Sequence, residues 1–177
     1  MSTIYLLDSN SLITASRSYY SFQICPGFWD ALLKGHSENR IKTIDRVKGE
    51  INDGKYNDDL KKWVNDLPNS FFCSTREESV IKRFGEIANW VNNQEQFFDY
   101  AKANFMNDKV DGWLIAYVMA GLEGEQIKVV THEAYSKEIK NEVKIPNICN
   151  AFGVEYVNTF EMLNDIEVKL ILEDNDE

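Results

Sequence analysis

Four acidic residues adjoin apolar segments that should be buried: Asp8, Glu50, Asp111 and Glu133. The apolar run 4–7 leads directly into Asp8, and the run 127–130 leads to Glu133 three residues later. Asp111 opens an apolar helical stretch, so it also marks a boundary of buried structure. Because ligand sites in parallel sheets lie outside the carboxyl ends of the strands, these carboxylates should gather at that edge.

Such a gathering of negative charge predicts a bound cation. Carboxylates held close together repel one another and raise one another's pKa unless a positive charge offsets them. A hard divalent ion is the expected partner, because Mg²⁺ and Mn²⁺ prefer carboxylate and water oxygens. The pattern therefore indicates a metal-dependent hydrolase of phosphodiesters, in which one or two Mg²⁺ or Mn²⁺ ions generate hydroxide from bound water.

The apolar segments that would position these acids predict an α/β fold. The run 3–7 alternates little and is typical of a buried central strand of a parallel sheet, and strands are also predicted at 41–44, 127–130 and 154–157. Apolar spacing and start signals predict helices that begin near residues 12, 26, 45, 57, 75, 108, 135, 146 and 159. We therefore expect one three-layer α/β/α sandwich with a central parallel sheet.

Several of these helices have recognisable start signals. Thr75 followed by Glu78 matches a capping box and predicts a helical region to about residue 104, which Asn92-Asn93 can divide in two. Asp45 and Thr159 are likewise predicted to cap the helices that follow them. A short helix is predicted through residues 135–140.

The size and composition of the chain fit one ordinary globular domain. Of its 177 residues, 27% are charged and 44% are hydrophobic, which is typical of such proteins, and we expect a single domain over residues 1–172. The acidic end, residues 173–177, is predicted to be a disordered tail. No apolar run approaches the roughly 20 residues that a membrane span needs, and no signal-peptide pattern precedes the first strand.

The cysteines favour a reducing compartment. Cys25, Cys73 and Cys149 are odd in number, widely spaced and without a CxxC pair. Structural zinc is therefore not expected, and buried free thiols in a cytoplasmic protein are.

The net charge of −10 does not decide for or against a nucleic-acid substrate. Setting aside the four acids of the tail and the four candidate site acids, which bound metal would neutralise, leaves a net charge of −2. Residues 40–62 hold seven basic and five acidic side chains, a weak candidate for phosphate contacts. Mixed charge on helices is, however, more often an ordinary solvated surface.

The four acidic segments, taken in order, resemble the motifs of PIN domains, which are small metal-dependent nucleases. The matching segments are Tyr5-Leu6-Leu7-Asp8-Ser9-Asn10, Val47-Lys48-Gly49-Glu50-Ile51, Asp111 with Trp113-Leu114-Ile115-Ala116, and Val129-Val130-Thr131-His132-Glu133. Two more segments resemble a PIN-like family known as a domain of unknown function, DUF4411: Pro26-Gly27-Phe28-Trp29 and Ile145-Pro146-Asn147-Ile148-Cys149. The resemblance covers the chain up to the acidic tail.

This resemblance implies a metal-dependent endoribonuclease of the kind that serves as the toxin of a toxin-antitoxin pair. It implies RNA as the substrate, a cognate antitoxin as a protein partner, no membrane partner, and a fold compatible with a homodimer. The residues that it marks as catalytic are Asp8, Glu50, Asp111 and Glu133. Those that it marks as ligands of Mg²⁺ or Mn²⁺ are Asp8, Glu50, Asp111 and Asp108.

The first two motifs each allow a purely structural interpretation. Asp8 could merely cap the helix that follows, although Ser9 or Asn10 could do so without it. Glu50 would be an ordinary exposed residue of an amphipathic helix if the order of the motifs were ignored.

The third and fourth motifs also allow alternatives. Asp108 and Asp111 should face similarly on one helix, and Asp108 either joins the site or only caps that helix. Glu133 stands where many PIN domains have aspartate, so its longer side chain could bind metal through a water molecule. Thr131 and Asn10 are secondary candidates that could orient a carboxylate or a metal-bound water.

Two other functions compete with the nuclease interpretation. A phosphatase of the haloacid dehalogenase type also begins with a strand that ends in aspartate, but it needs a second aspartate where this chain has Asn10. A catalytically weak PIN-like module that binds a protein partner or nucleic acid is the remaining alternative.

Overall fold

The first strand lies at the centre of the sheet because its side chains are apolar on both faces. β1 (Thr3–Leu7) is buried at its last four residues and pairs in parallel with β2 (Ile41–Ile44) on one side and β4 (Gln126–Val130) on the other. The short strands β3 (Phe72–Cys73) and β5 (Tyr156–Val157) extend the sheet in parallel at its two ends. The strand order is β3-β2-β1-β4-β5.

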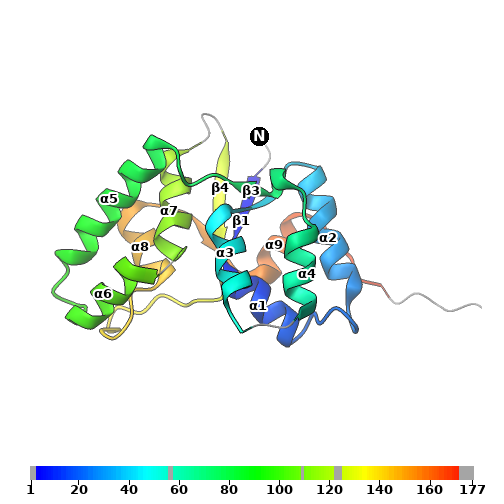
Figure 1. The fold of residues 1–177 in the computed structure, drawn as a ribbon, viewed down its shortest axis with the longest axis horizontal. Helices are drawn as coiled ribbons and strands as arrows, with labels where there is room; N and C mark the ends of the chain where they lie inside the picture. The colour runs from blue at the N-terminus through cyan, green and yellow to red at the C-terminus, as the bar shows by residue number, and fades with distance from the viewer. Residues whose placement is uncertain (1–2, 56–57, 109, 122–124, 172–177) are drawn as a thin grey trace, which may run out of the picture.

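The fold is the expected three-layer α/β/α sandwich (Figure 1). The structure is a computed structural model that describes residues 3–55, 58–108, 110–121 and 125–171. The predicted tail at 173–177 therefore lies outside the described residues. One layer is formed by α5, α6, α7 and α8, and the helices α1, α2, α4 and α9 lie on the other side of the strands (Figure 1).

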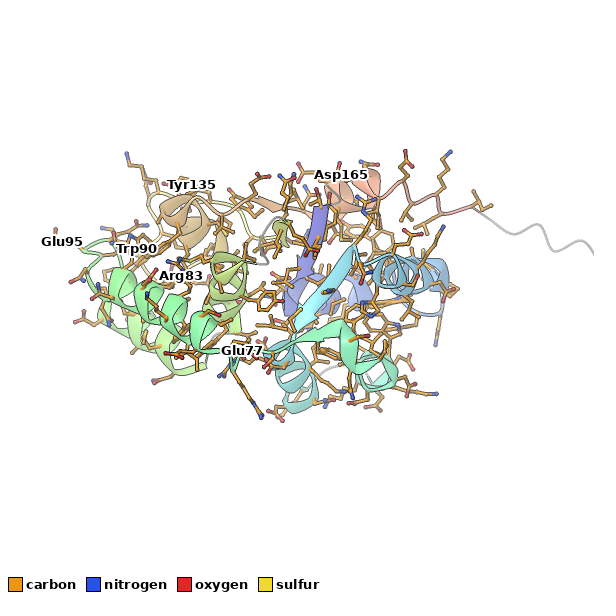
Figure 2. The ribbon with its side chains drawn as sticks, turned by 90° about the horizontal axis from the view of Figure 1, so that it is seen from above. Glu77, Arg83, Trp90, Glu95, Tyr135 and Asp165 are labelled. Atoms are coloured by element: carbon orange, nitrogen blue, oxygen red, sulfur yellow. The ribbon has the colours of Figure 1, made fainter. Side chains whose placement is uncertain are left out.

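Most of the helices begin close to the predicted positions. In chain order they are α1 (Ser9–Arg17), α2 (Pro26–Ser37), α3 (Asp45–Asp53), α4 (Asp58–Asp66), a 3-10 turn η1 (Asn69–Phe71), α5 (Glu78–Asn92), α6 (Asp99–Asp108), α7 (Val110–Ala120), α8 (Ile145–Phe152) and α9 (Thr159–Asp165). The long region predicted after Thr75 does divide near Asn92-Asn93. Its first part, α5, leads away from the sheet, with Glu77 near the strands and Glu95 at the far end (Figure 2).

One predicted helix is absent, and one observed strand was not predicted. The helix predicted at 135–140 is absent, because backbone carbonyls there bond to other segments. Ile139 O accepts from Gln96 Nε2, and Lys140 O accepts from Phe98 N. The strand β3 was not predicted, because a strand of two residues is too short to show a periodic pattern of apolar side chains.

The helix caps differ from those predicted. α5 begins at Glu78 after Glu77, without the expected capping box from Thr75. Thr75 is 1% exposed and instead bonds to Asp45 and Arg46 of α3. Asp45 is the first residue of α3, not its cap.

The last helix shows a similar shift of one residue. Asn158, not Thr159, caps α9 and forms a capping box with Glu161. Asp108 is the last described residue of α6 and Asp111 lies in the first turn of α7. Residue 109 between them lies outside the described residues, so the expectation that the two acids share one helix stays a prediction.

The core contains the apolar residues of both layers and the central strands. Trp29 is 2% exposed, and the other tryptophans are partly buried against the core. All three cysteines are free thiols, of which Cys149 is buried. No helix within the described residues is long and apolar enough to cross a membrane.

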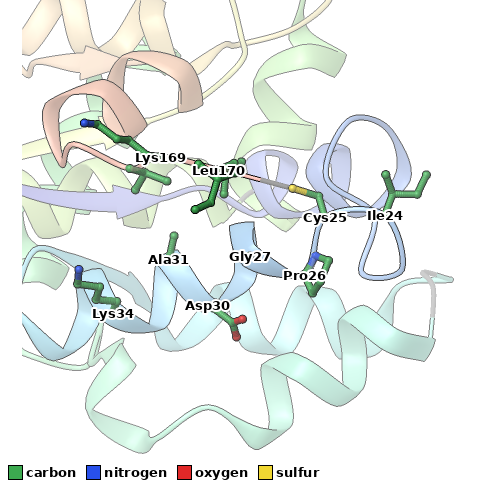
Figure 3. Close-up of a pocket in the computed structure, with 11 residues that line it drawn as sticks. Ile24, Cys25, Pro26, Gly27, Asp30, Ala31, Lys34, Lys169 and Leu170 are labelled. Atoms are coloured by element: carbon green, nitrogen blue, oxygen red, sulfur yellow. The ribbon is translucent and has the colours of Figure 1, made fainter. Parts of the chain in front are cut away.

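A pocket of about 760 Å³ lies between α2 and the segment 168–171 (Figure 3). Its walls include apolar side chains such as Ile24 and Leu170, with Lys34 and Lys169 at its side. None of the candidate site residues lines it.

Candidate functional site

The carboxyl ends of β1 and β4 bring two candidate segments together. β1 ends at Leu7, directly before Asp8, and β4 ends at Val130, directly before Thr131. Leu7 and Val130 are paired in the sheet, and Asp8 N donates to Val130 O at 3.1 Å. Asp8 and Thr131 therefore lie side by side at this edge.

Asp8 is enclosed by protein and is held in one position. It is 1% exposed and caps α1 by accepting a hydrogen bond from Ser11 N at 2.5 Å. Its other oxygen, Oδ2, is buried and accepts no hydrogen bond within the described structure. Burial raises the pKa of Asp8 from 3.8 to about 6, the charge of Glu133 adds to the rise, and hydrogen bonding by Ser11 and Thr131 opposes it.

Glu50 also has an oxygen without a hydrogen-bond partner. It lies on α3, where Val47 and Ile51 are buried against the core, and its own side chain is half-buried. Its Oε2 is buried and accepts no hydrogen bond from the described residues. Glu50 belongs to α3, which packs against both α1 and α7. Asp8 caps α1, and Asp111 lies in α7.

Asp111 lies in the first turn of α7 and is 8% exposed. A carboxylate there interacts favourably with the positive end of the helix dipole. Gly112, the residue after Asp111, allows this turn of α7 to approach its neighbours closely. A Cβ atom on Gly112 would come within 2.7 Å of Phe105 and 2.9 Å of Phe84, so glycine permits the close packing that positions Asp111.

Asp108 is the last described residue of α6, and α7 is described from Val110 onward. Its side chain lies outside the described part of the molecule. Asp108 and Asp111 therefore both stay candidates for the third carboxylate of the site.

Glu133 has a structural contact that the sequence did not predict. Its Oε2 accepts a hydrogen bond from Ile145 N at 2.7 Å, and its own N–H donates to Thr131 Oγ1 at 3.2 Å. Ile145 is the first residue of α8, where backbone N–H groups lack partners within the helix. Glu133 thus stabilises the start of α8 and holds it at the edge of the sheet beside Asp8.

The two secondary candidates differ in their surroundings. Thr131 is 2% exposed, directly follows β4 beside Asp8, and accepts a hydrogen bond from Glu133 N through its Oγ1. Asn10 is exposed in the first turn of α1. Thr131 is therefore a buried part of the site. Asn10, two residues after Asp8, is exposed to solvent.

Sequence reasoning missed a polar residue in the first turn of α8. Asn147 is 6% exposed and its Nδ2 donates to Ser136 O at 2.9 Å. Its Oδ1 is buried without a hydrogen-bond partner in the described structure. Asn147 lies inside one of the two segments that resemble DUF4411, which was the signal that could have identified it.

The described residues at this edge do not form a complete protein cage for a metal ion. Within the described residues, no three or more His, Cys, Asp or Glu side chains are grouped so that they could hold a metal ion. Two buried carboxylate oxygens, Asp8 Oδ2 and Glu50 Oε2, nevertheless lack hydrogen-bond partners. Mg²⁺ commonly binds through only one or two carboxylates and keeps several waters, so these oxygens are suitable ligands for it.

Comparison with known proteins places the chain in one family without naming an activity. No curated protein and no solved structure matches the chain. A family model described as "Domain of unknown function (DUF4411)" matches residues 5–170. Because this match covers nearly the whole sequence, the chain belongs to the DUF4411 family.

Proposed function

We propose that this protein is a PIN-like, metal-dependent endoribonuclease that hydrolyses RNA phosphodiester bonds with Mg²⁺ or Mn²⁺. The observation that carries the proposal is the buried carboxylate of Asp8 at the end of the central strand, whose Oδ2 has no hydrogen-bond partner in the described structure. Such an oxygen is expensive to bury unless something binds it. The choice of RNA, and a role as a cytoplasmic toxin, rest on the resemblance to PIN domains.

The residues at the sheet edge would divide the work of binding and orientation. Asp8 and Glu50 offer their free oxygens to the ion, and Asp111 and Asp108 are the candidates for a third carboxylate. A divalent ion bound there would activate a water molecule and stabilise charge on the phosphate. Asp8 is suited to bind the ion because the hydrogen bond from Ser11 N fixes its Oδ1 and leaves its Oδ2 available.

Glu133 and Thr131 would support this arrangement from the next strand. The bond from Ile145 N already engages one oxygen of Glu133, so its main part is to hold α8 and Thr131 beside Asp8. A direct catalytic role for Glu133, and an orienting role for Asn10, stay predictions.

A second candidate function is binding without catalysis. It is favoured by one observation, namely that the described residues contain no group of three metal-binding side chains. In that case the chain would be a PIN-like module that binds a protein partner or nucleic acid.

Cleavage assays with matched variants separate these two functions. Purified protein is incubated with structured and unstructured RNAs, in Mn²⁺ or in chelator, beside the variant Asp8→Asn. The nuclease proposal predicts cleavage that requires the metal and falls at least about a hundredfold in Asp8→Asn, the scale of losing a key catalytic group. Equal cleavage with and without metal would refute the mechanism, and no cleavage of any nucleic acid would favour the binding module.

Thermal melting gives a readout that does not depend on turnover. Ligand that binds only the native state raises the melting temperature, so Mn²⁺ should stabilise the wild-type protein and should have little effect on Asp8→Asn. A variant that keeps both its cleavage and its stabilisation by Mn²⁺ would remove Asp8 from the site.

The proposed toxin role predicts a protein partner. We expect a cognate antitoxin to be encoded by a neighbouring reading frame and its co-expression to relieve growth arrest caused by this protein. An isolated gene whose overexpression leaves growth unchanged would contradict the toxin role and leave the nuclease proposal standing. Light scattering of the purified chain would decide whether it forms a homodimer.

A further inference from the structure

Arg46 stands beside the acidic edge of the sheet, and among the described residues it forms no ion pair with an acidic side chain. Arg46 is the second residue of α3, which begins directly after β2 ends. Its side chain is exposed. Glu50 follows one turn later on the same face of α3, so the guanidinium and a candidate metal ligand project from the same helix.

Two contacts fix the guanidinium of Arg46. It lies over the ring of Trp113, with Cζ 3.9 Å from the ring centroid, and its Nε donates to Thr75 Oγ1 at 3.0 Å. Phe84 stacks on the same indole at 3.9 Å and nearly parallel, so it must cover the opposite face of Trp113. The result is a three-layer stack of guanidinium, indole and phenyl rings from α3, α7 and α5.

A second set of bonds fixes Thr75 in turn. Its hydroxyl donates to Asp45 Oδ1 at 2.8 Å and its N–H donates to Asp45 Oδ2 at 3.3 Å. Asp45 therefore orients Arg46 through Thr75, and no ion pair between Asp45 and Arg46 occurs in the described structure. An arginine held in this way loses little conformational freedom when it binds a ligand.

The outer donors of Arg46 are available to a ligand. Arginine has five N–H donors, and the bond to Thr75 uses only the one on Nε. Within the described residues, Nη1 and Nη2 donate to no acceptor. A guanidinium with free forked donors recognises carboxylate or phosphate groups through two parallel hydrogen bonds.

The position of Arg46 beside the candidate nuclease site favours a phosphate group over a carboxylate as its ligand. It follows β2, the immediate neighbour of β1 in the sheet, and neighbouring strands are about 4.8 Å apart. Its stacking partner Trp113 lies two residues after Asp111 on α7. We infer that Arg46 binds a backbone phosphate of a single-stranded RNA that crosses the acidic edge, and so positions the strand over the site. This inference deepens the proposed ribonuclease function and rests on it.

Metal-free binding tests the inference without turnover. Fluorescence anisotropy measures binding of a labelled, unstructured RNA oligonucleotide in chelator over a series of KCl concentrations. Arg46→Met keeps an apolar stem over Trp113 but removes the charge. We expect roughly ten- to hundredfold weaker binding, the range of a charge-assisted hydrogen bond, and a salt slope that is smaller by about 0.7 for one lost phosphate contact.

Two further variants control for charge and for folding. Arg46→Lys should keep the salt slope but lose part of the affinity, because lysine lacks the forked donors. Arg40→Met is the matched control, since Arg40 also lies over an aromatic ring, that of Tyr5 at 5.9 Å, but precedes β2 at the opposite edge. It should bind RNA like the wild type. Equal affinity and salt slope for Arg46→Met and Arg40→Met would overturn the inference.

A modified RNA identifies the contact itself. One neutral methylphosphonate linkage is moved along the oligonucleotide, and wild-type binding should weaken at one position at which Arg46→Met shows no further loss. An additive loss at every position would show that Arg46 touches no single phosphate and would overturn the inference. Inorganic phosphate should compete no better than chloride at equal ionic strength, and strong competition would reassign the subsite to the free anion.

Cleavage kinetics then separate this inference from the proposed function. If cleavage depends on metal and Arg46→Met has unchanged KM and kcat, the Arg46 inference fails and the ribonuclease stands. If no RNA is cleaved but Arg46→Met still loses binding, the ribonuclease fails and the phosphate contact stands. Where both hold, KM should rise about tenfold in Arg46→Met and kcat should change little.

Discussion

Replacement of Asp8 by asparagine should stabilise the metal-free protein at neutral pH. Burial raises the pKa of Asp8 from 3.8 to about 6, so the native state keeps this proton at pH values where the unfolded chain has lost it. Stability therefore falls as pH rises from about 4 to about 6, and the loss is complete above pH 6. At about 1.4 kcal/mol per pKa unit, the loss is roughly 3 kcal/mol.

Asparagine removes this loss without removing the cap. It serves as an N-cap about as well as aspartate does, so it can still accept the bond from Ser11 N. In chelator near pH 7.5 the variant should gain up to about 3 kcal/mol. For a chain of this size that gain corresponds to roughly 6–12 °C in melting temperature. Near pH 4 the two proteins should melt at nearly the same temperature.

Melting curves across pH, all in chelator, test this expectation. Asp53→Asn serves as a control, because Asp53 is exposed at the end of α3 and its replacement should change stability by less than about 0.5 kcal/mol. Parallel pH profiles for wild type and Asp8→Asn, with no gain near neutral pH, would refute the reasoning that burial makes the charged form of Asp8 costly.

Three more predictions follow from the contacts at the edge of the sheet. Glu133→Ala should lose about 1 kcal/mol in urea unfolding because it removes the acceptor of Ile145 N, whereas Glu133→Gln should lose less than half of that; equal losses would contradict the capping role. Glu50→Gln in chelator should be at least as stable as wild type, because the free Oε2 is buried, yet its metal-dependent cleavage should fall at least about a hundredfold; a marked loss of stability would show that Glu50 is structural. Burial raises the pKa of Cys149 to about 12, so iodoacetamide should modify this thiol only after unfolding, and mass spectrometry showing rapid native labelling would contradict its burial.

The sequence could predict the elements whose signals are local. Four consecutive apolar residues before Asp8 identify a buried central strand, and the runs at 41–44 and 127–130 identify its neighbours. Parallel pairing of such strands brings their carboxyl ends to one edge. The position of Asp8 at that edge therefore followed from short stretches of sequence.

Contacts between distant segments could not be predicted in this way. Glu133 reaches Ile145 across 12 positions in the chain, so its capping role depends on where α8 packs. Thr75 has the local pattern of a helix cap, but Asp45, 30 positions earlier, binds its hydroxyl instead. At Thr75, a tertiary hydrogen bond outweighs the local preference for a helix cap.

The choice of aspartate at residue 8 is itself informative about function. A serine or asparagine would cap α1 about as well and would carry no charge into a site that is 1% exposed. The carboxylate therefore costs the isolated fold roughly the 3 kcal/mol given above, and the unpaired oxygen of Glu50 adds a further cost. Both costs concern oxygens that would become favourable ligands if a cation lay at the edge of the sheet. These costs support the proposal that the two carboxylates bind an ion, and they are the reason that removing the charge of Asp8 should stabilise the metal-free fold and abolish its response to metal.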